Sequence, residues 1–211
     1  MAIEFRSVTK RFGDGAAAVD DVSLEMPARK TTVLVGSSGC GKTTLLRMIN
    51  RLIEPTSGDI TIDGESIRSR DAVQLRRSIG YVLQNAGLLP HYTVADNIAT
   101  VPVLTGQTRA SARRRALDLM EVVGLDTAFA DRYPAQLSGG QQQRVGVARA
   151  LAADPNILLM DEPFGAVDPI VRKELQAEVI RLQRELDKTI VFVTHDIDEA
   201  FLLGDQVVIL Q

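Results

Sequence analysis

The residues best suited to chemistry lie in a loop that follows an apolar stretch at residues 33–35. Gly36, Gly41, Lys42 and Thr43 fit the spacing G-x-x-x-x-G-K-[ST], between a strand-like run and a helix-like pattern. Glycines leave the backbone free to wrap around a ligand, so that successive N–H groups point inward and suit a polyphosphate. The helix would add the positive end of its dipole, Lys42 a mobile cation, and Thr43 a hydroxyl for Mg²⁺.

We therefore predict a nucleotide phosphate site in this loop, against the alternative of a Gly/Ser-rich turn with an ordinary surface lysine. Its predicted residues are Gly36, Ser37, Ser38, Gly39, Cys40, Gly41, Lys42, Thr43 and Thr44.

Two adjacent carboxylates form the second chemical element. Asp161 and Glu162 follow four apolar residues, which indicate a parallel strand buried on both faces. Ligands bind at the carboxyl ends of such strands, and adjacent strand residues point to opposite sides. We assign Asp161 to the Mg²⁺ shell and Glu162 to the attacking water, as general base or positioner. A solvated pair at the end of a strand is the alternative.

Three more side chains have two readings each. Gln84 ends the apolar run 79–83, where it would ligate Mg²⁺ or orient a water, or else bond to backbone. His195 ends the run 189–194 in line with the acids, and we favour a bond to a terminal phosphate over a structural histidine. Phe12 either stacks on a base or is buried in a hairpin.

A second helix start, at Ser138, is expected to expose backbone N–H groups as the first phosphate site does. Ser138 stands where an N-cap would, and Gly139 and Gly140 expose backbone N–H groups. Gln141 follows them. This arrangement indicates a second anion site, although taken alone it is only a well-capped helix.

The elements around these residues indicate an α/β fold. Period-two apolar spacing in the first thirty residues predicts an antiparallel sheet edge, and helical periodicity predominates from 85 to 153. At 211 residues and 45% hydrophobic, the chain suits one large domain or a core with a subdomain.

Composition excludes several classes of protein. A net charge of −3 argues against broad nucleic-acid binding, and no apolar run nears the roughly 20 residues that cross a bilayer. A single cysteine, Cys40, excludes an internal disulfide and a cysteine-cluster zinc site. Two histidines, His91 and His195, leave little for a transition-metal site, so that a metal should be a hard cation held by oxygens. We expect a soluble, cytoplasmic chain, and the abrupt end at Gln211 favours a natural carboxyl-terminal extension.

The motifs GSSGCGKT, a glutamine-ended strand, LSGGQQQR, ILLMDEP and THD occur in this order across the 211 residues. Together they resemble the ATP-binding subunit of an ATP-binding-cassette transporter. The resemblance implies a P-loop NTPase core with a RecA-like, mostly parallel sheet, an N-terminal antiparallel β subdomain and an inserted α-helical signature subdomain. The core would span 1–84 and 154–211, and the helical subdomain 85–153.

The resemblance implies roles for individual residues. Nucleotide contacts fall on Phe12, which stands where an adenine-stacking tyrosine is usual, and on Val19. Catalytic roles fall on Lys42, Gln84, Glu162 and the switch histidine His195, and Mg²⁺ ligands are Thr43, Gln84 and Asp161. Ser138, Gly139, Gly140 and Gln141 would contact the ATP held by the opposite subunit, and Asp168 would lie in the loop that links the two sites. Gly165 departs from the usual serine or asparagine of that loop.

The family mechanism implies partners. Two copies, or a pair of cassette subunits, would close head to tail around two Mg-ATP and drive membrane permease subunits at the cytoplasmic face, together with an extracytoplasmic solute-binding protein and no nucleic acid. Residues 48–58 and 84–94 resemble stretches of the ATP-binding subunits of importers of quaternary amines such as glycine betaine, choline or carnitine. The alternatives are an importer of another small polar solute and a soluble cassette ATPase that works on DNA or ribosomes. Glu162 and His195 argue against a module that binds ATP without hydrolysing it.

Overall fold

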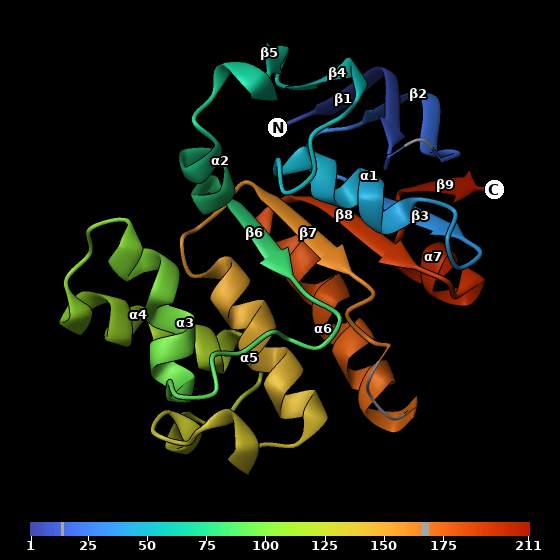
Figure 1. Cartoon of the computed structure of the whole chain (residues 1–211). Coiled ribbons are helices and arrows are strands. Elements are labelled where there is room, and N and C mark those ends of the chain that lie inside the picture. Colours follow the sequence, from blue (N-terminus) through green and yellow to red (C-terminus); the bar gives the residue numbers. More distant parts are fainter. Residues whose placement is uncertain (14, 166–168) are drawn as a thin grey trace.

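The structure is a computed structural model that describes residues 1–13, 15–165 and 169–211, and these residues form two sheets (Figure 1). The first sheet is antiparallel, with the order β2 (Ala17–Met26), β1 (Ile3–Arg11), β4 (Ser57–Ile62) and β5 (Glu65–Ser66). The second is parallel, with the order β6 (Ile79–Val82), β7 (Ile157–Asp161), β8 (Thr189–Thr194), β3 (Thr31–Gly36) and β9 (Gln206–Leu210). The predicted α/β class, with an antiparallel part beside a parallel sheet, is confirmed.

The inner strands β7, β8 and β3 of the parallel sheet are buried on both faces, as their apolar runs predict. Leu159 packs toward α1 (Lys42–Ile49) and the antiparallel sheet, whereas its neighbours Leu158 and Met160 pack toward the helices on the other face. In Figure 1, α1 lies between the two sheets. Because successive strand residues alternate between faces, one short run contributes to two hydrophobic clusters.

Helices supply the second face of that sheet. They are α3 (Val94–Leu104), α4 (Arg109–Val122), α5 (Gly139–Leu151), α6 (Pro169–Leu186) and α7 (Ile197–Leu203). Helix α2 (Ala72–Ser78) lies next to β6, and its Leu75 packs in the hydrophobic cluster on the α1 face. In Figure 1, α3 and α4 lie beside α5, away from the strands, and the predicted division into 1–84, 85–153 and 154–211 stays a prediction. Among the described residues, no helix combines the length and apolar character needed to cross a membrane.

Strand direction gathers the candidate residues. Parallel strands end at the same edge of a sheet, and ligands of open α/β sheets bind there. β3 leads into the glycine loop, β6 into Gln84, β7 into Glu162 and β8 into His195. These four strands are consecutive in the sheet, so that the four segments emerge side by side.

Candidate functional site

The glycine loop folds around its own lysine. Lys42 is 5% exposed, and its Nζ donates to the carbonyl oxygens of Gly36 at 2.9 Å and Ser37 at 2.7 Å. The Sγ of Cys40 lies 3.7 Å from the same nitrogen. The ammonium group therefore already lies inside the loop, where an anion would meet it.

Gly41 cannot be replaced without disturbing this loop. Its φ is 90°, and a Cβ there would lie 2.3 Å from the carbonyl oxygen of Ala18 and 3.2 Å from Cγ2 of Val19. Only glycine adopts that backbone angle freely and leaves room for β2. Val19, which is predicted to contact the nucleotide, is 5% exposed and packs against the loop.

The start of α1 offers backbone donors to an anion. Gly41 is its N-cap and no side chain caps it, so that the first N–H groups of the helix are available to a ligand. A cavity of about 200 Å³ opens beside it. Its lining comprises Ala18, Ser38, Gly39, Gly41, Lys42, Thr43, Thr44 and Glu162. The loop and Glu162 therefore border one space.

Asp161 and Thr43 are direct neighbours. The Thr43 hydroxyl donates to Oδ1 of Asp161 at 2.8 Å, and the aspartate is 5% exposed. A hydroxyl and a carboxylate are oxygen ligands of the kind that Mg²⁺ prefers. Among the described residues, no cluster of three or more His, Cys, Asp or Glu side chains forms a metal site. A Mg²⁺ bound here would therefore need phosphate oxygens or water to complete its shell.

Glu162 joins two of the other predicted residues. Its Oε2 lies 3.3 Å from Nε2 of Gln84 and 3.3 Å from Nδ1 of His195. The backbone of Glu162 is left-handed, with a φ of 46°, and its N–H donates to the carbonyl of Val193 at 3.0 Å. The structure thus brings the ends of β6, β7 and β8 together at one carboxylate oxygen.

The two adjacent acids have separate surroundings. Asp161 contacts Thr43 on α1, whereas Glu162 contacts Gln84 and His195. Gln84, which is predicted to ligate Mg²⁺, is bonded to Glu162 in this conformation.

Phe12 is exposed. Its exposed fraction is 55%, which rules out the reading that it is buried in a hairpin. Lys10 Nζ lies 4.9 Å from the centroid of its ring, within the range of a cation–π contact. Stacking on a base stays a prediction.

The second capped helix start forms as predicted. At the start of α5, Oγ of Ser138 accepts from the N–H of Gln141 at 3.3 Å, and Oε1 of Gln141 accepts from the N–H of Ser138 at 2.9 Å. These reciprocal bonds form a capping box. Ser138 and Gly139 are exposed, whereas Gly140 is buried. Figure 1 shows this end of α5 well apart from the loop between β3 and α1. Asp168 lies outside the described residues.

Sequence reasoning missed two residues of the site. Tyr81 on β6 donates its hydroxyl to Oδ2 of Asp161 at 3.1 Å, and Arg47 on α1 reaches the same oxygen at 3.4 Å. Burial, with the Asp161 carboxylate as a further cause, raises the pKa of Tyr81 to about 12. Two signals could have found them: a phenol inside a buried strand, and an arginine one helical turn after Thr43.

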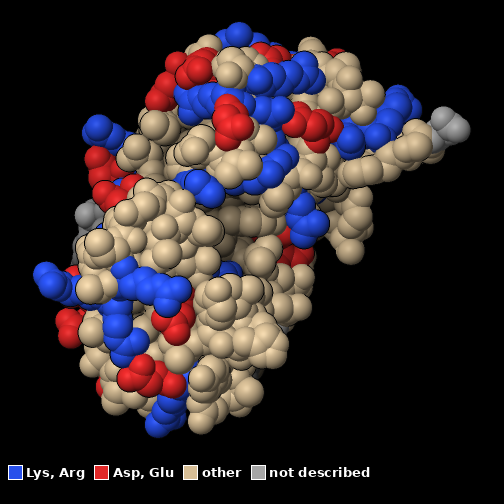
Figure 2. Space-filling model, turned by 60° about the vertical axis from the view of Figure 1, so that its left-hand side comes forward, with Lys and Arg blue, Asp and Glu red and all other residues tan. Residues whose placement is uncertain are grey.

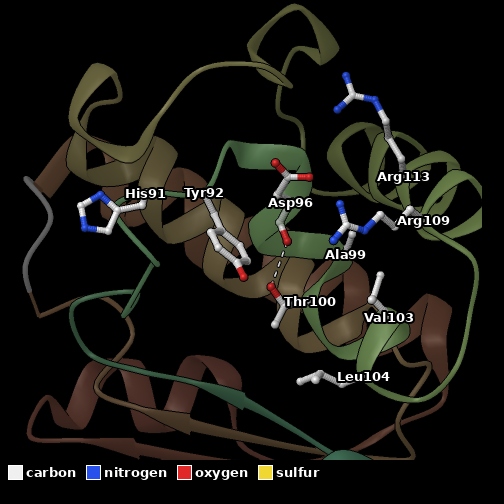
Figure 3. Close-up of a pocket in the computed structure, with 9 residues that line it drawn as sticks. All are labelled: His91, Tyr92, Asp96, Ala99, Thr100, Val103, Leu104, Arg109 and Arg113. Atoms are coloured by element: carbon white, nitrogen blue, oxygen red, sulfur yellow. Dashed lines mark hydrogen bonds between the residues drawn. The ribbon is translucent and has the colours of Figure 1, made fainter.

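A cavity larger than the one beside the glycine loop lies on the helical part. It has a volume of about 410 Å³. Its lining comprises His91, Tyr92, Asp96, Ala99, Thr100, Val103, Leu104, Arg109 and Arg113 (Figure 3). Tyr92 and Leu104 are 47% and 55% exposed, and Figure 3 shows His91 and Arg113 at opposite ends of the lining. The lining therefore combines exposed apolar side chains with cationic ones.

Comparison with known proteins identifies the family. A family model described as ABC transporter matches residues 19–165. The chain belongs to the ABC transporter family. The match contains the glycine loop, the capped start of α5 and the acidic pair of this cassette.

Relatives of the cassette include transport subunits. It is 53% identical over 209 residues to the carnitine transport ATP-binding protein OpuCA of Listeria monocytogenes. That alignment covers 99% of this chain and 53% of the relative. It is 55% identical over 208 residues to the glycine betaine uptake system ATP-binding protein YehX of Escherichia coli. This second alignment covers 99% of this chain and 67% of the relative. The chain thus spans about half the length of OpuCA.

Solved structures of similar cassettes confirm the fold. A dimeric structure of the ATP-binding cassette MJ0796 in a post-hydrolysis state bound to ADP and Pi has a TM-score of 0.88 and 35% identity. The superposition covers 99% of this chain and 94% of that one. The arrangement of sheets and helices is therefore that of an ABC ATPase cassette.

Proposed function

We propose that this cassette is the ATP-hydrolysing subunit of an importer for quaternary-amine compatible solutes such as glycine betaine, choline or carnitine. The observation that carries the ATPase proposal is the convergence of Gln84 and His195 on Glu162, beside the cavity that the glycine loop borders. Hydrolysis needs a bound terminal phosphate and an activated water next to it. In this arrangement the glycine loop would bind the phosphate and Glu162 would activate the water. The solute class is supported by relatives named for carnitine and glycine betaine transport.

Each residue has a chemical task in this proposal. Lys42 and the N–H groups at the start of α1 bind the phosphates, and Phe12 and Val19 contact the base. Thr43 and Asp161 would hold Mg²⁺, with Gln84 as a further ligand, and the cation would offset negative charge on the transferred phosphoryl group. Glu162 orients the attacking water and accepts its proton. His195, which faces the same carboxylate oxygen, bonds to the terminal phosphate once ATP is bound.

The site is completed by a second copy. Ser138, Gly139, Gly140 and Gln141 form an anion-suited helix start that lies apart from the glycine loop of its own chain (Figure 1). Two copies paired head to tail would bring each such start over the nucleotide of the other, with Asp168 between the two sites. The similar cassette MJ0796 is described as dimeric with ADP and Pi bound, which supports pairing of two copies.

The importer needs membrane partners. We propose that permease subunits bind the cassette at the cytoplasmic face of the membrane, with a solute-binding protein on the outer side. The cavity of Figure 3, with exposed Tyr92 and Leu104 beside Arg109, suits a docked permease segment. No nucleic-acid partner is proposed, because the net charge is −3 and basic and acidic side chains are interspersed on the face in Figure 2.

A conservative substitution tests the ATPase proposal. Glu162→Gln keeps the size of the side chain and removes the base, so that ATP binding should persist while turnover nearly disappears and a nucleotide-bound dimer accumulates. Binding is measured by calorimetry, turnover by phosphate release, and the dimer by gel filtration. Asp126→Asn, the same acid-to-amide change on the helical part, serves as the control. Unchanged hydrolysis in Glu162→Gln would remove Glu162 from its role.

The solute proposal has its own experiment. The full-length protein is reconstituted with the permease and solute-binding protein encoded beside it, and uptake of labelled glycine betaine is followed with and without ATP. ATP-dependent uptake that is lost in Glu162→Gln supports the proposal. Uptake of an unrelated solute, or copurification with ribosomes or DNA in place of a permease, would contradict it.

A further inference from the structure

Asp161 has its two carboxylate oxygens engaged by different groups. Oδ1 accepts from the Thr43 hydroxyl at 2.8 Å. Oδ2 accepts from the Tyr81 hydroxyl at 3.1 Å and lies 3.4 Å from Nη2 of Arg47. Thr43 and Arg47 are one turn apart on α1, whereas Tyr81 comes from β6. The carboxylate is therefore held from a helix and from a neighbouring strand.

The direction of the Tyr81 bond follows from its other partner. Nε of Arg47 lies 3.2 Å from the same phenol oxygen, and a guanidinium can only donate. The Tyr81 oxygen thus accepts from Arg47, and its single proton is left for Oδ2 of Asp161. Arg47 thus donates to the Tyr81 oxygen, and Arg47 and Tyr81 both donate to Oδ2 of Asp161.

We propose that Tyr81 and Arg47 are positioning residues that fix the Asp161 carboxylate so that Oδ1, beside the Thr43 hydroxyl, faces the bound cation. This inference rests on the proposed Mg²⁺ site of the ATPase and adds to it the groups that set its geometry. A carboxylate of 5% exposure without these donors would rotate or bond elsewhere, because a buried charge needs partners. Tyr81 and Arg47 act through Asp161, and neither lines the cavity beside the glycine loop.

Cation affinity separates this role from simple packing. Tyr81→Phe keeps the ring and removes the hydroxyl. With ADP at saturation, we measure Mn²⁺ binding from the electron paramagnetic resonance signal of the free ion. Mn²⁺ should bind about tenfold more weakly in Tyr81→Phe, the scale of one hydrogen bond to a charged group. ADP affinity in EDTA should match the wild type, so that the loss is confined to the cation.

A control and a second variant complete the experiment. Tyr133→Phe removes the same atom from an exposed side chain on the helical part, and it should leave Mn²⁺ affinity unchanged. Arg47→Lys keeps the charge but lacks the guanidinium fork, and at 43% side-chain exposure it is tolerated by the fold. It should weaken Mn²⁺ binding in the same direction as Tyr81→Phe, and it decides the question if Tyr81→Phe does not fold.

The outcomes distinguish this inference from the proposed function. Wild-type Mn²⁺ affinity in both folded variants would overturn the positioning role while leaving the ATPase proposal intact. A wild-type chain that binds ADP equally with and without Mn²⁺, and hydrolyses no ATP, would contradict the proposed function itself.

Discussion

Arg149 on α5 anchors the segment that follows Gln84. Its guanidinium donates to the carbonyl oxygens of Ala86 at 2.5 Å and Gly87 at 2.7 Å. From the same helix, Gln143 donates to the carbonyl of Leu83 at 3.3 Å. The helix that begins with the capped glycines therefore holds residues 83–87 in place. We predict that Arg149→Met loosens this segment.

The magnitude follows from the two lost hydrogen bonds. A bond from a charged donor contributes about 1.5–3 kcal/mol. Desolvation lowers the pKa of Arg149, so that burying the guanidinium costs part of that gain. We therefore expect the free energy of unfolding to fall by about 2 kcal/mol. For a chain of this size, that corresponds to a melting temperature lower by about 4–8 °C.

Two measurements test the prediction. Thermal unfolding gives the stability change, and amide hydrogen exchange reports the opening of residues 83–87. Exchange in this segment should accelerate, and ATP turnover should fall more than ATP binding, because Gln84 loses its fixed place beside Glu162. Arg114→Met, the same change at an exposed position on α4, is the control. A melting temperature and exchange pattern equal to those of Arg114→Met would refute the anchoring argument.

The remaining predictions concern the glycine loop. Gly41→Ala should abolish ATP binding in calorimetry, because its Cβ would lie 2.3 Å from a backbone oxygen, whereas Gly64→Ala, with a φ of 79° and open space around it, should bind normally. Alkylation of Cys40, which lies 3.7 Å from Lys42 Nζ, should block ATP, and bound ATP should protect the thiol from the reagent; full labelling with unchanged affinity would count against this. Hydrolysis per subunit should fall on dilution to monomers, and a rate independent of concentration would contradict the shared site.

The sequence predicts the fold where signals are local. Apolar runs that end in Gln84, Asp161 and His195 indicate parallel strands, and they form at β6, β7 and β8. The Ser138 capping box is likewise local, because both of its partners lie within four residues. Parallel strands then place their polar ends at one edge, so that the gathering of candidate residues follows from strand order.

Other features depend on contacts that sequence spacing does not contain. The bond between Tyr81 and Asp161 joins residues that are 80 positions apart, and it depends on β6 pairing directly with β7. A phenol inside a buried strand indicates that its hydroxyl needs a partner, but the local sequence does not say that the partner is Asp161. The exposure of Phe12 could not be decided either, because the same hairpin pattern permits a buried or an outward ring. Tertiary pairing resolves both.

Asp161 and Glu162 point to different surroundings for two reasons: alternation along the strand, and a turn of the backbone at Glu162. β7 ends at Asp161, and Glu162 leaves the strand through a left-handed backbone with a φ of 46°. That conformation costs a non-glycine residue about 1–2 kcal/mol, and glycine would adopt it freely. The bond from its N–H to Val193 fixes the turn, and the turn carries the carboxylate to Gln84 and His195. The turn therefore gives the carboxylate a set position beside the cavity that the glycine loop borders, as the proposed catalytic role of Glu162 requires.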